Sequence, residues 1–508
     1  MLYFLTYNAL ADVKPAAIFA DNMVLQRETK APVWGLADPG EKVTVIGSWG
    51  ESASAIADET GKWTTPLQTP EAGGPYTLTI KGKNAIEIQN VLSGEVWFCS
   101  GQSNMDFEML KLAKFKVGRT KPVDQEAAEY VKKEIATARD DQLRQFTVQK
   151  NTSPLEPLDA LKGSWIVSYP KTNAEFSATA YFFGRELRRE LDVPVALIKC
   201  AWGGTRIEAW MPAGAFQGDK EMAAYYQTQG KSLEGPNIIG DKAEEAPKKA
   251  KPTNKERRHD YPSTLFNAMV NPVIPYAIRG AIWYQGEANS KHNTDKYERN
   301  LRALISSWRE LWGQRDSPFY FVQLANYAKP KLGSVEYDGW PSVCNQQRRT
   351  LGLKNTGMAV LSDIGEADDV HPHNKIDVGK RLALWALKND YKQDIPVCSG
   401  PLYKSHEMKG GKVIITFDSV GSGLMTGEKT GMAEAKETSG PLKHFQICGA
   451  DRAWKWAEAN IVGQDTLEVW HDDIAEPLDV RYAWSSNPEG ANLYNKEGLP
   501  ASLFKIQP

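Results

Sequence analysis

The sequence has little cysteine, almost no net charge and no long apolar stretch, and each of these absences excludes a class of protein. Its 508 residues include five cysteines, whose spacing matches no metal-binding motif: Cys99, Cys200, Cys344, Cys398 and Cys448. The 61 Lys and Arg residues and 63 Asp and Glu residues give a net charge of −2, so nucleic acids and anionic membranes meet no basic field. No stretch approaches the roughly 18 apolar residues of a spanning helix. We expect a globular protein that neither binds nucleic acid nor spans a membrane.

The chain is too long for one core, and short β-rich runs occupy both of its ends. Near the N-terminus such runs alternate with Gly- and Pro-containing turns, which predicts a small sandwich with strands at 42–46, 53–56, 63–67, 76–80 and 85–88. Near the C-terminus they recur at 412–417, 445–448, 454–456, 459–462, 466–470 and 478–484. We expect an N-terminal β-rich domain over residues 1–92 and a C-terminal β-rich region over 393–508. The pattern leaves open whether the two form one module.

Between these ends, strands and helices alternate, which is typical of a largely parallel sheet with helices on both faces. The expected strands are 95–100, 142–148, 194–201, 278–284, 318–324 and 357–363, and the expected helices are 125–139, 177–191, 296–312, 343–353 and 375–391. A charged stretch near 230–262 has almost no large apolar residues and is predicted to be a solvated insertion. The middle domain is thus expected to be α/β and to span residues 93–392.

The first eleven residues are apolar and end in a small-x-small pattern, Ala9-Leu10-Ala11. This pattern is typical of a signal peptide cleavage site, although the positively charged start of such a peptide is absent. We predict a secreted or periplasmic protein.

Residues 95–105 read EVWFCSGQSNM, an apolar strand that ends in a tight turn. The turn presents Ser103 at the carboxyl end of a strand, where open α/β sheets bind ligands. Ser103 is therefore a candidate nucleophile. The competing interpretation is an ordinary helix cap after a strand, because serine and asparagine are common at that position.

Three further segments also follow or flank predicted strands. Residues 202–210 read WGGTRIEAW, and the glycines Gly203 and Gly204 suit either a plain turn or an oxyanion hole, because they let backbone N–H groups approach a ligand. Residues 283–289 read WYQGEAN, in which Gln285 offers an amide donor and Glu287 a carboxylate. In the fourth segment His371 follows Asp368 by three residues on a loop that leads into a helix. A serine, a histidine and a carboxylate are the components of a catalytic triad.

The nucleophile elbow of the α/β-hydrolases requires the pattern Gly-x-Ser-x-Gly. Here residues 101–105 read GQSNM and lack the second glycine. The sequence therefore does not fit that class.

The four segments, the last reading IGEADDVHPHNK over 364–375, closely resemble the sialate O-acetylesterase family of the SGNH hydrolases. The resemblance extends to NMVLQ at 22–26, VRYAW at 480–484 and NLY at 492–494, and so covers nearly the whole chain. It implies an SGNH-type, flavodoxin-like parallel sheet with flanking β-sandwich-like regions. It also implies a serine esterase that removes O-acetyl groups from carbohydrates through an acetyl-enzyme, without metal or cofactor.

By position, the resemblance makes Ser103 the nucleophile and His371 the base. The Ser103 backbone, Gly203 or Gly204, and Gln285 would line the oxyanion hole. The carboxylate is assigned to Asp368, with Asp369 as its competitor and a Ser-His dyad as a third possibility. Candidate substrate-binding residues are Gln102, Arg206, Trp283, Glu287 and Asn289.

The sequence leaves the substrate open between acetylated sialic acid and acetylated xylan or xyloglucan, and it does not indicate the oligomeric state. Two other functions compete with the esterase. One is a glycoside hydrolase that uses Glu287 with a second carboxylate. The other is a carbohydrate-binding protein without catalysis, which would need a broken triad.

Overall fold

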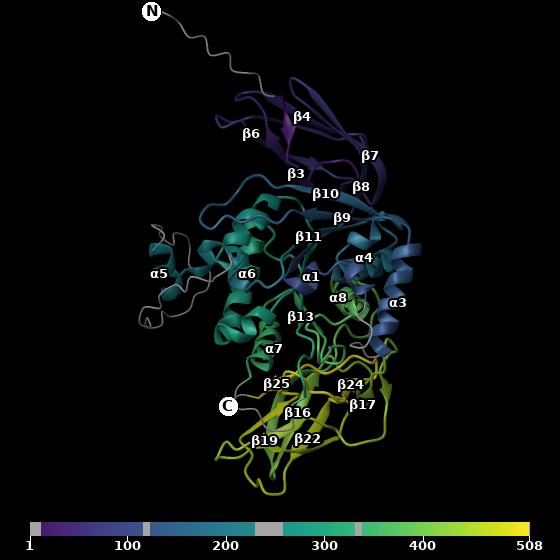
Figure 1. The fold of residues 1–508 in the computed structure, drawn as a ribbon, viewed down its shortest axis with the longest axis vertical. Coiled ribbons are helices and arrows are strands. Elements are labelled where there is room, and N and C mark those ends of the chain that lie inside the picture. Colours follow the sequence, from purple (N-terminus) through teal and green to yellow (C-terminus); the bar gives the residue numbers. More distant parts are fainter. Residues whose placement is uncertain (1–11, 115–121, 229–257, 331–337, 507–508) are drawn as a thin grey trace, which may run out of the picture.

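The computed structural model describes residues 12–114, 122–228, 258–330 and 338–506. Figure 1 shows three regions along the long axis: a β-rich N-terminal region, a central α/β region and a β-rich C-terminal region. The predicted export segment at 1–11 and most of the predicted insertion near 230–262 lie outside the described residues. No helix among the described residues is long and apolar enough to cross a membrane.

The central region is built on a parallel sheet whose strands are buried over most of their length within this region, which is typical of near-continuous apolar runs. The strands are β8 (Ala85–Gly101), β9 (Asp140–Val148), β11 (Val195–Ala201), β12 (Gly280–Tyr284), β13 (Phe319–Gln323) and β14 (Thr356–Val360). They lie in the order β9-β11-β8-β12-β13-β14, and neighbouring strands are parallel. Numbered along the chain, these six parallel strands lie in the order 2-3-1-4-5-6. The antiparallel strand β10 (Gly163–Ser168), which the sequence did not predict, extends the sheet beyond β9.

Helices cover both faces of this sheet, at the positions that the sequence predicts. They are α3 (Pro122–Thr137), α4 (Ala178–Leu191), α6 (Tyr297–Leu311), α7 (Gly339–Thr350) and α8 (Lys375–Asn389). Figure 1 shows α6 and α7 on one side of the strands and α3, α4 and α8 on the other. Helices α4 and α8 pack against each other, and α8 also packs on β13 and β14. The loop that carries His371 connects β14 to α8 and therefore lies at the end of the sheet. The short helices are α1 (Ser103–Asp106), α2 (Met109–Leu112) and α5 (Lys220–Thr228).

The N-terminal region shares a strand with the central sheet. It contains β1 (Lys14–Pro15), β2 (Val24–Gln26), β3 (Lys30–Leu36), β4 (Lys42–Gly47), β5 (Ser52–Ile56), β6 (Lys62–Gln68) and β7 (Gly73–Lys81). Strand β8 pairs with β7 and β2 over its first part and with β11 and β12 over its second part. The predicted boundary between residues 92 and 93 therefore falls inside one continuous strand.

The C-terminal region consists of small antiparallel sheets packed under the central region. Its strands are β15 (Leu402–Lys409), β16 (Lys412–Asp418), β17 (Leu424–Glu428), β18 (Lys436–Glu437), β19 (Phe445–Cys448), β20 (Lys455–Trp456), β21 (Glu458–Ile461), β22 (Thr466–Trp470), β23 (Asp479–Tyr482), β24 (Leu493–Asn495) and β25 (Phe504–Lys505). Hydrogen bonds join it to the central region, among them Gln323 to Ser502 at 2.9 Å and Ser486 to Asp338 at 2.6 Å. All five cysteines are buried and unpaired.

Candidate active site

The register of three neighbouring strands brings the first three motifs to one edge of the sheet. Gly101, the last residue of β8, lies opposite Ala201 at the end of β11 and opposite Tyr284 at the end of β12. The loops that carry Ser103, Gly203 and Gln285 therefore leave the sheet at the same level. Because β8 is the strand at which the chain order reverses, this edge is the topological switch point where such sheets bind ligands.

The turn that presents Ser103 depends on a glycine. Gly101 has a φ of +140°, and a Cβ at this position would collide with the carbonyl oxygen of Tyr284. Glycine alone fits such a close approach and such a backbone conformation. Ser103 then begins the short helix α1 and is partly exposed, whereas Gln102 and Asn104 on either side are buried. The serine hydroxyl is thus the polar group that this turn offers to a substrate.

Of the two candidate oxyanion glycines, Gly203 lies against the nucleophile. A Cβ built on Gly203 would be 3.1 Å from the Cβ of Ser103 and 3.5 Å from its Cα. Gly204 is exposed and has a φ of +74°. A side chain at residue 203 would press against Ser103, so the backbone at this position lies beside the nucleophile.

His371 has a carboxylate partner, and that partner is Asp369. Asp369 Oδ1 accepts a hydrogen bond from the His371 backbone N at 2.8 Å and lies 2.9 Å from its ring Nδ1. Partial burial raises the pKa of Asp369, but the hydrogen bonds from His371 more than offset this, and the pKa lies below its ordinary value. Asp368 is exposed instead. The assignment to Asp368 is therefore corrected: the two-residue spacing, not the three-residue spacing, brings the carboxylate to the ring.

Asn104 joins the nucleophile turn to the histidine loop. Its side-chain amide donates to the carbonyl oxygen of Val370 at 3.0 Å and to Glu287 Oε1 at 2.6 Å. The His371 ring also stacks on Phe107, with 5.2 Å between the ring centroids. The hydrogen bonds of the described residues do not include one between Ser103 and His371. In substrate-free enzymes this bond is often long and forms only in the complex.

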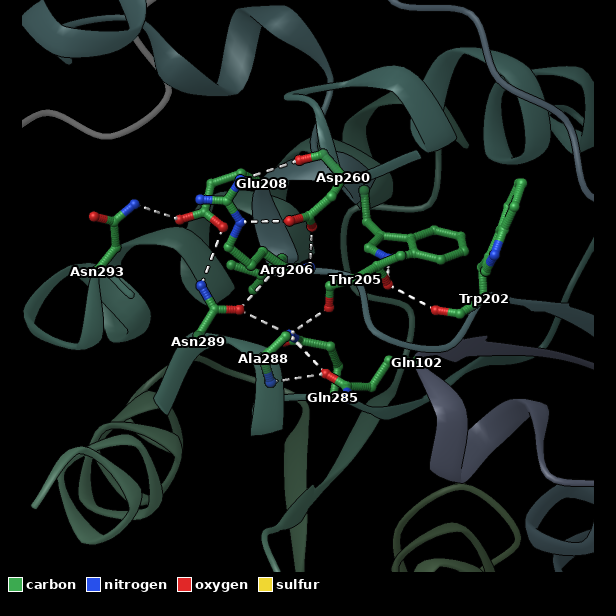
Figure 2. A network of polar contacts seen from close by, with 12 residues as sticks. Gln102, Trp202, Thr205, Arg206, Glu208, Asp260, Gln285, Ala288, Asn289 and Asn293 are labelled. Carbon is green, nitrogen blue, oxygen red and sulfur yellow. Dashed lines mark hydrogen bonds and ion pairs between the residues drawn. The ribbon is translucent and has the colours of Figure 1, made fainter. Parts of the chain in front are cut away.

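Gln285 does not bind an oxyanion in this geometry, contrary to our prediction. Its side chain is fully buried, and its amide nitrogen contacts Gln102 Oε1, Thr205 O and Asn289 Oδ1 at 3.2, 3.1 and 2.7 Å. Its Oε1 accepts a hydrogen bond from the Tyr297 hydroxyl at 2.9 Å. Figure 2 shows Gln285 at the centre of this network. Because its donors are occupied, Gln285 cross-links the loops rather than facing a substrate.

Three predicted substrate-binding residues also belong to the interior. Gln102 Oε1 accepts from Gln285 and from the Ala288 backbone N, the latter at 3.2 Å. Asn289 is buried, accepts a hydrogen bond from Ile207 N at 3.0 Å and donates to Glu208 Oε2 at 3.1 Å. Trp283 is buried and packs edge-on against two other tryptophans. The contacts of these side chains inside the protein hold the loops together.

Arg206 and Glu287 are partly committed to other partners. Arg206 Nε forms an ion pair with Asp260 Oδ2 at 2.8 Å, which ties the glycine loop to the described end of the predicted insertion (Figure 2). Burial raises the pKa of Glu287, and the hydrogen bond from Asn104 only partly opposes this. Its Oε2 is buried and has no hydrogen-bond partner. The carboxylate of Glu287 therefore packs between the motif loops rather than facing an open cleft.

Sequence reasoning missed Asn104 and Lys375 as contributors to this site. Both lie inside the motifs over 95–105 and 364–375, but the sequence pattern assigns neither of them a role. Among the described residues, no group of three His, Cys, Asp or Glu side chains is arranged to hold a metal ion.

Comparison with known proteins identifies the family. Residues 93–235 and 252–388 match the family model described as carbohydrate esterase, sialic acid-specific acetylesterase. The mouse and human sialate O-acetylesterases are each 29% identical to the chain, cover 97% and 96% of it, and are themselves covered over 94% and 91%. A carbohydrate acetylesterase from Xanthomonas citri is 34% identical, covers 98% of the chain, is itself fully covered (100%) and superposes with a TM-score of 0.81.

The edge of the sheet carries a serine on one loop and a histidine with a carboxylate partner on another, which are the residue types of a serine hydrolase site. The chain belongs to the sialic acid-specific acetylesterase family of carbohydrate esterases. It is a carbohydrate O-acetylesterase, which excludes the glycoside hydrolase and the non-catalytic binding protein as its principal function.

Proposed function

We propose that the enzyme releases acetate by nucleophilic catalysis, with Ser103 as nucleophile and His371 as general base. The hydroxyl of Ser103 attacks the acetyl carbonyl carbon while His371 takes its proton. The tetrahedral intermediate then collapses, the sugar oxygen leaves with the proton from His371, and acetyl-Ser103 remains. Water, activated by the same histidine, hydrolyses this ester and releases acetate.

The observation that carries this proposal is the meeting of the motifs at one sheet edge, with the Gly203 backbone beside Ser103 and the His371 loop hydrogen-bonded to Asn104. Asp369 is the group that orients the His371 ring, since it contacts Nδ1. We assign the oxyanion hole to the backbone N–H groups of Ser103 and Gly203. The loss of one such donor typically costs on the order of 10²–10³ in turnover.

The sugar that carries the acetyl group is the open part of this function. The curated mammalian relatives are named for sialate, whereas the Xanthomonas relative is named only for carbohydrate. We propose acetylated sialic acid and acetylated xylan or xyloglucan as the two substrate classes to compare. No described feature favours one of them.

The test is acetate release from these three substrates and from p-nitrophenyl acetate, by the wild type and by Ser103→Ala. Ser103→Ala removes one oxygen from a partly exposed turn, so it should remain folded and lose turnover to the background rate. The matched control is Ser290→Ala, which removes a hydroxyl bonded to the Glu287 carbonyl oxygen at 2.7 Å on a neighbouring loop. Near-normal acetate release by a folded Ser103→Ala enzyme would refute the assignment.

A further inference from the structure

A wholly buried lysine lies between the nucleophile turn and the histidine loop. Lys375 is the first residue of α8 and has no solvent-exposed surface. Both features are unfavourable for a lysine, because burial removes its hydration and the N-terminus of a helix repels positive charge. A residue retained at such a position needs strong local partners, and their identity indicates its role.

Lys375 has two hydrogen-bond partners on different segments. Its Nζ donates to Asn104 Oδ1 at 2.6 Å and to the carbonyl oxygen of Pro372 at 2.7 Å. The rings of Phe107 and Tyr284 also face the amine, with centroids 5.7 and 5.6 Å from Nζ. The first partner adjoins Ser103, and the second adjoins His371.

Asn104 links Lys375 to Val370, the residue that precedes His371 in the chain. Lysine only donates, and the Val370 carbonyl oxygen only accepts, so the amide must point its oxygen at Lys375 and its nitrogen at Val370. Val370 and Pro372 flank His371 in the chain. Through Asn104 and directly, the single amine therefore restrains the residues on both sides of the proposed base.

We propose that Lys375 is a positioning residue that aligns His371 with Ser103 by acting through Asn104 and the Pro372 carbonyl. The inference rests on the proposed roles of Ser103 and His371. Lys375 does not touch the reacting atoms. Its charged neighbours are Glu287, Glu366 and Asp369, all of which favour its protonated form, whereas burial opposes it.

The first test is Lys375→Met, which keeps an unbranched apolar chain and removes the amine. A displacement of about 1 Å at a catalytic group can cost on the order of 10²-fold. We expect kcat on p-nitrophenyl acetate to fall about 10- to 100-fold, with KM within about threefold of the wild type. The rate at which an organophosphate such as diethyl p-nitrophenyl phosphate labels Ser103 should fall in proportion, because labelling needs the aligned pair but no sugar site.

The matched control is Lys429→Met. Lys429 directly follows β17, and its side chain is also buried against the start of α8. Its Nζ lies 2.8 Å from Oδ2 of Asp377, in the first turn of α8, and donates to the Ala433 carbonyl oxygen rather than to Asn104. Its loss should leave kcat and the labelling rate within about twofold. Equal losses in Lys375→Met and Lys429→Met would show a general effect on α8 and overturn the proposal.

A second variant tests whether Lys375 acts through Asn104, and it replaces Lys375→Met as the test if that variant fails to fold. Asn104→Asp keeps an acceptor for Lys375 but replaces the donor to Val370 and Glu287 by an oxygen, so kcat and labelling should fall while KM changes little. In the folded double variant Lys375→Met with Asn104→Asp, the loss of kcat should not exceed that of the worse single variant. The reason is that both substitutions disrupt the same hydrogen-bonded network. The proposal would be refuted if the kcat losses of the two single variants multiplied in the double variant, or if the Asn104→Asp enzyme kept wild-type activity.

These outcomes also separate the two proposals. Unchanged kcat and labelling in Lys375→Met, beside an inactive Ser103→Ala, would overturn only the positioning role. Activity in Ser103→Ala would overturn the catalytic assignment on which it rests.

Discussion

The substitution Asp369→Asn tests whether Asp369 is the carboxylate partner of His371 and how much its charge contributes to kcat. The carboxylate accepts from the His371 backbone N at 2.8 Å and lies 2.9 Å from Nδ1, so Asp369→Asn removes the charge from the ring's partner without removing bulk. In the buried triads of serine proteases such a change costs on the order of 10⁴ in kcat. Here the Asp369 side chain is 46% exposed, and solvent screens its charge.

A hydrogen bond to a charged group contributes about 1.5–3 kcal/mol, and exposure moves this one towards the low end. If about 1–2 kcal/mol of transition-state stabilisation depends on the charge, kcat should fall roughly 5- to 30-fold, since about 1.4 kcal/mol corresponds to tenfold. The control is Asp368→Asn, which alters the exposed neighbour and should change kcat by less than about twofold.

The measurement is kcat on p-nitrophenyl acetate at saturating substrate, with unfolding curves for both variants. A larger loss in Asp368→Asn than in Asp369→Asn would refute the partner assignment. A loss near 10⁴ in Asp369→Asn would refute the screening argument and imply that the loop closes over Asp369 when substrate binds. Two variants with wild-type kcat would indicate a Ser-His dyad.

Three further predictions concern other parts of the site. Gly203→Ala places a methyl group 3.1 Å from Ser103 Cβ, so kcat should fall at least tenfold with little change in thermal stability, and wild-type kcat would contradict the contact. Gln285→Met removes the amide that donates to the buried Thr205 carbonyl oxygen and to Asn289 Oδ1. It should lower the free energy of unfolding by about 1–3 kcal/mol in denaturant titrations, whereas an unchanged stability would contradict its cross-linking role. Burial lowers the pKa of Lys375 to about 7, so the unfolded chain binds a proton at this lysine that the folded chain lacks above that pH. The free energy of unfolding of the wild type, relative to Lys375→Met, should therefore rise between about pH 7 and pH 10, and a flat difference would contradict the shift.

The sequence predicts the parts of this fold that repeat a simple pattern. Buried parallel strands read as apolar runs, so β11 and β12 were located within two residues, and their ends located the loops of Gly203 and Gln285. The 163–168 strand is only partly buried and was missed. The alternation of apolar and polar residues along this strand is weak because the strand lies at the edge of the sheet.

The side-chain roles were harder to predict than the positions. Spacing along a loop does not determine which of two adjacent carboxylates turns towards His371, and that choice depends on a backbone hydrogen bond at residue 371. An amide such as Gln285 suits an oxyanion hole and a buried cross-link equally well, and only the acceptors around it distinguish the two. Lys375 carries no sequence signal, because its importance comes from burial between segments that are distant in the chain.

The shared strand β8 has a consequence for how the enzyme is made. During synthesis β2 and β7 precede β8, whereas β11 begins only at Val195 and β12 at Gly280. The strand that leads to Ser103 therefore has pairing partners long before its catalytic neighbours exist, and domains that emerge first generally fold first. We expect the N-terminal β region to act as a template that holds β8 in register until the later strands add to its far end. A chain that started at residue 93 would have to find that register without its template.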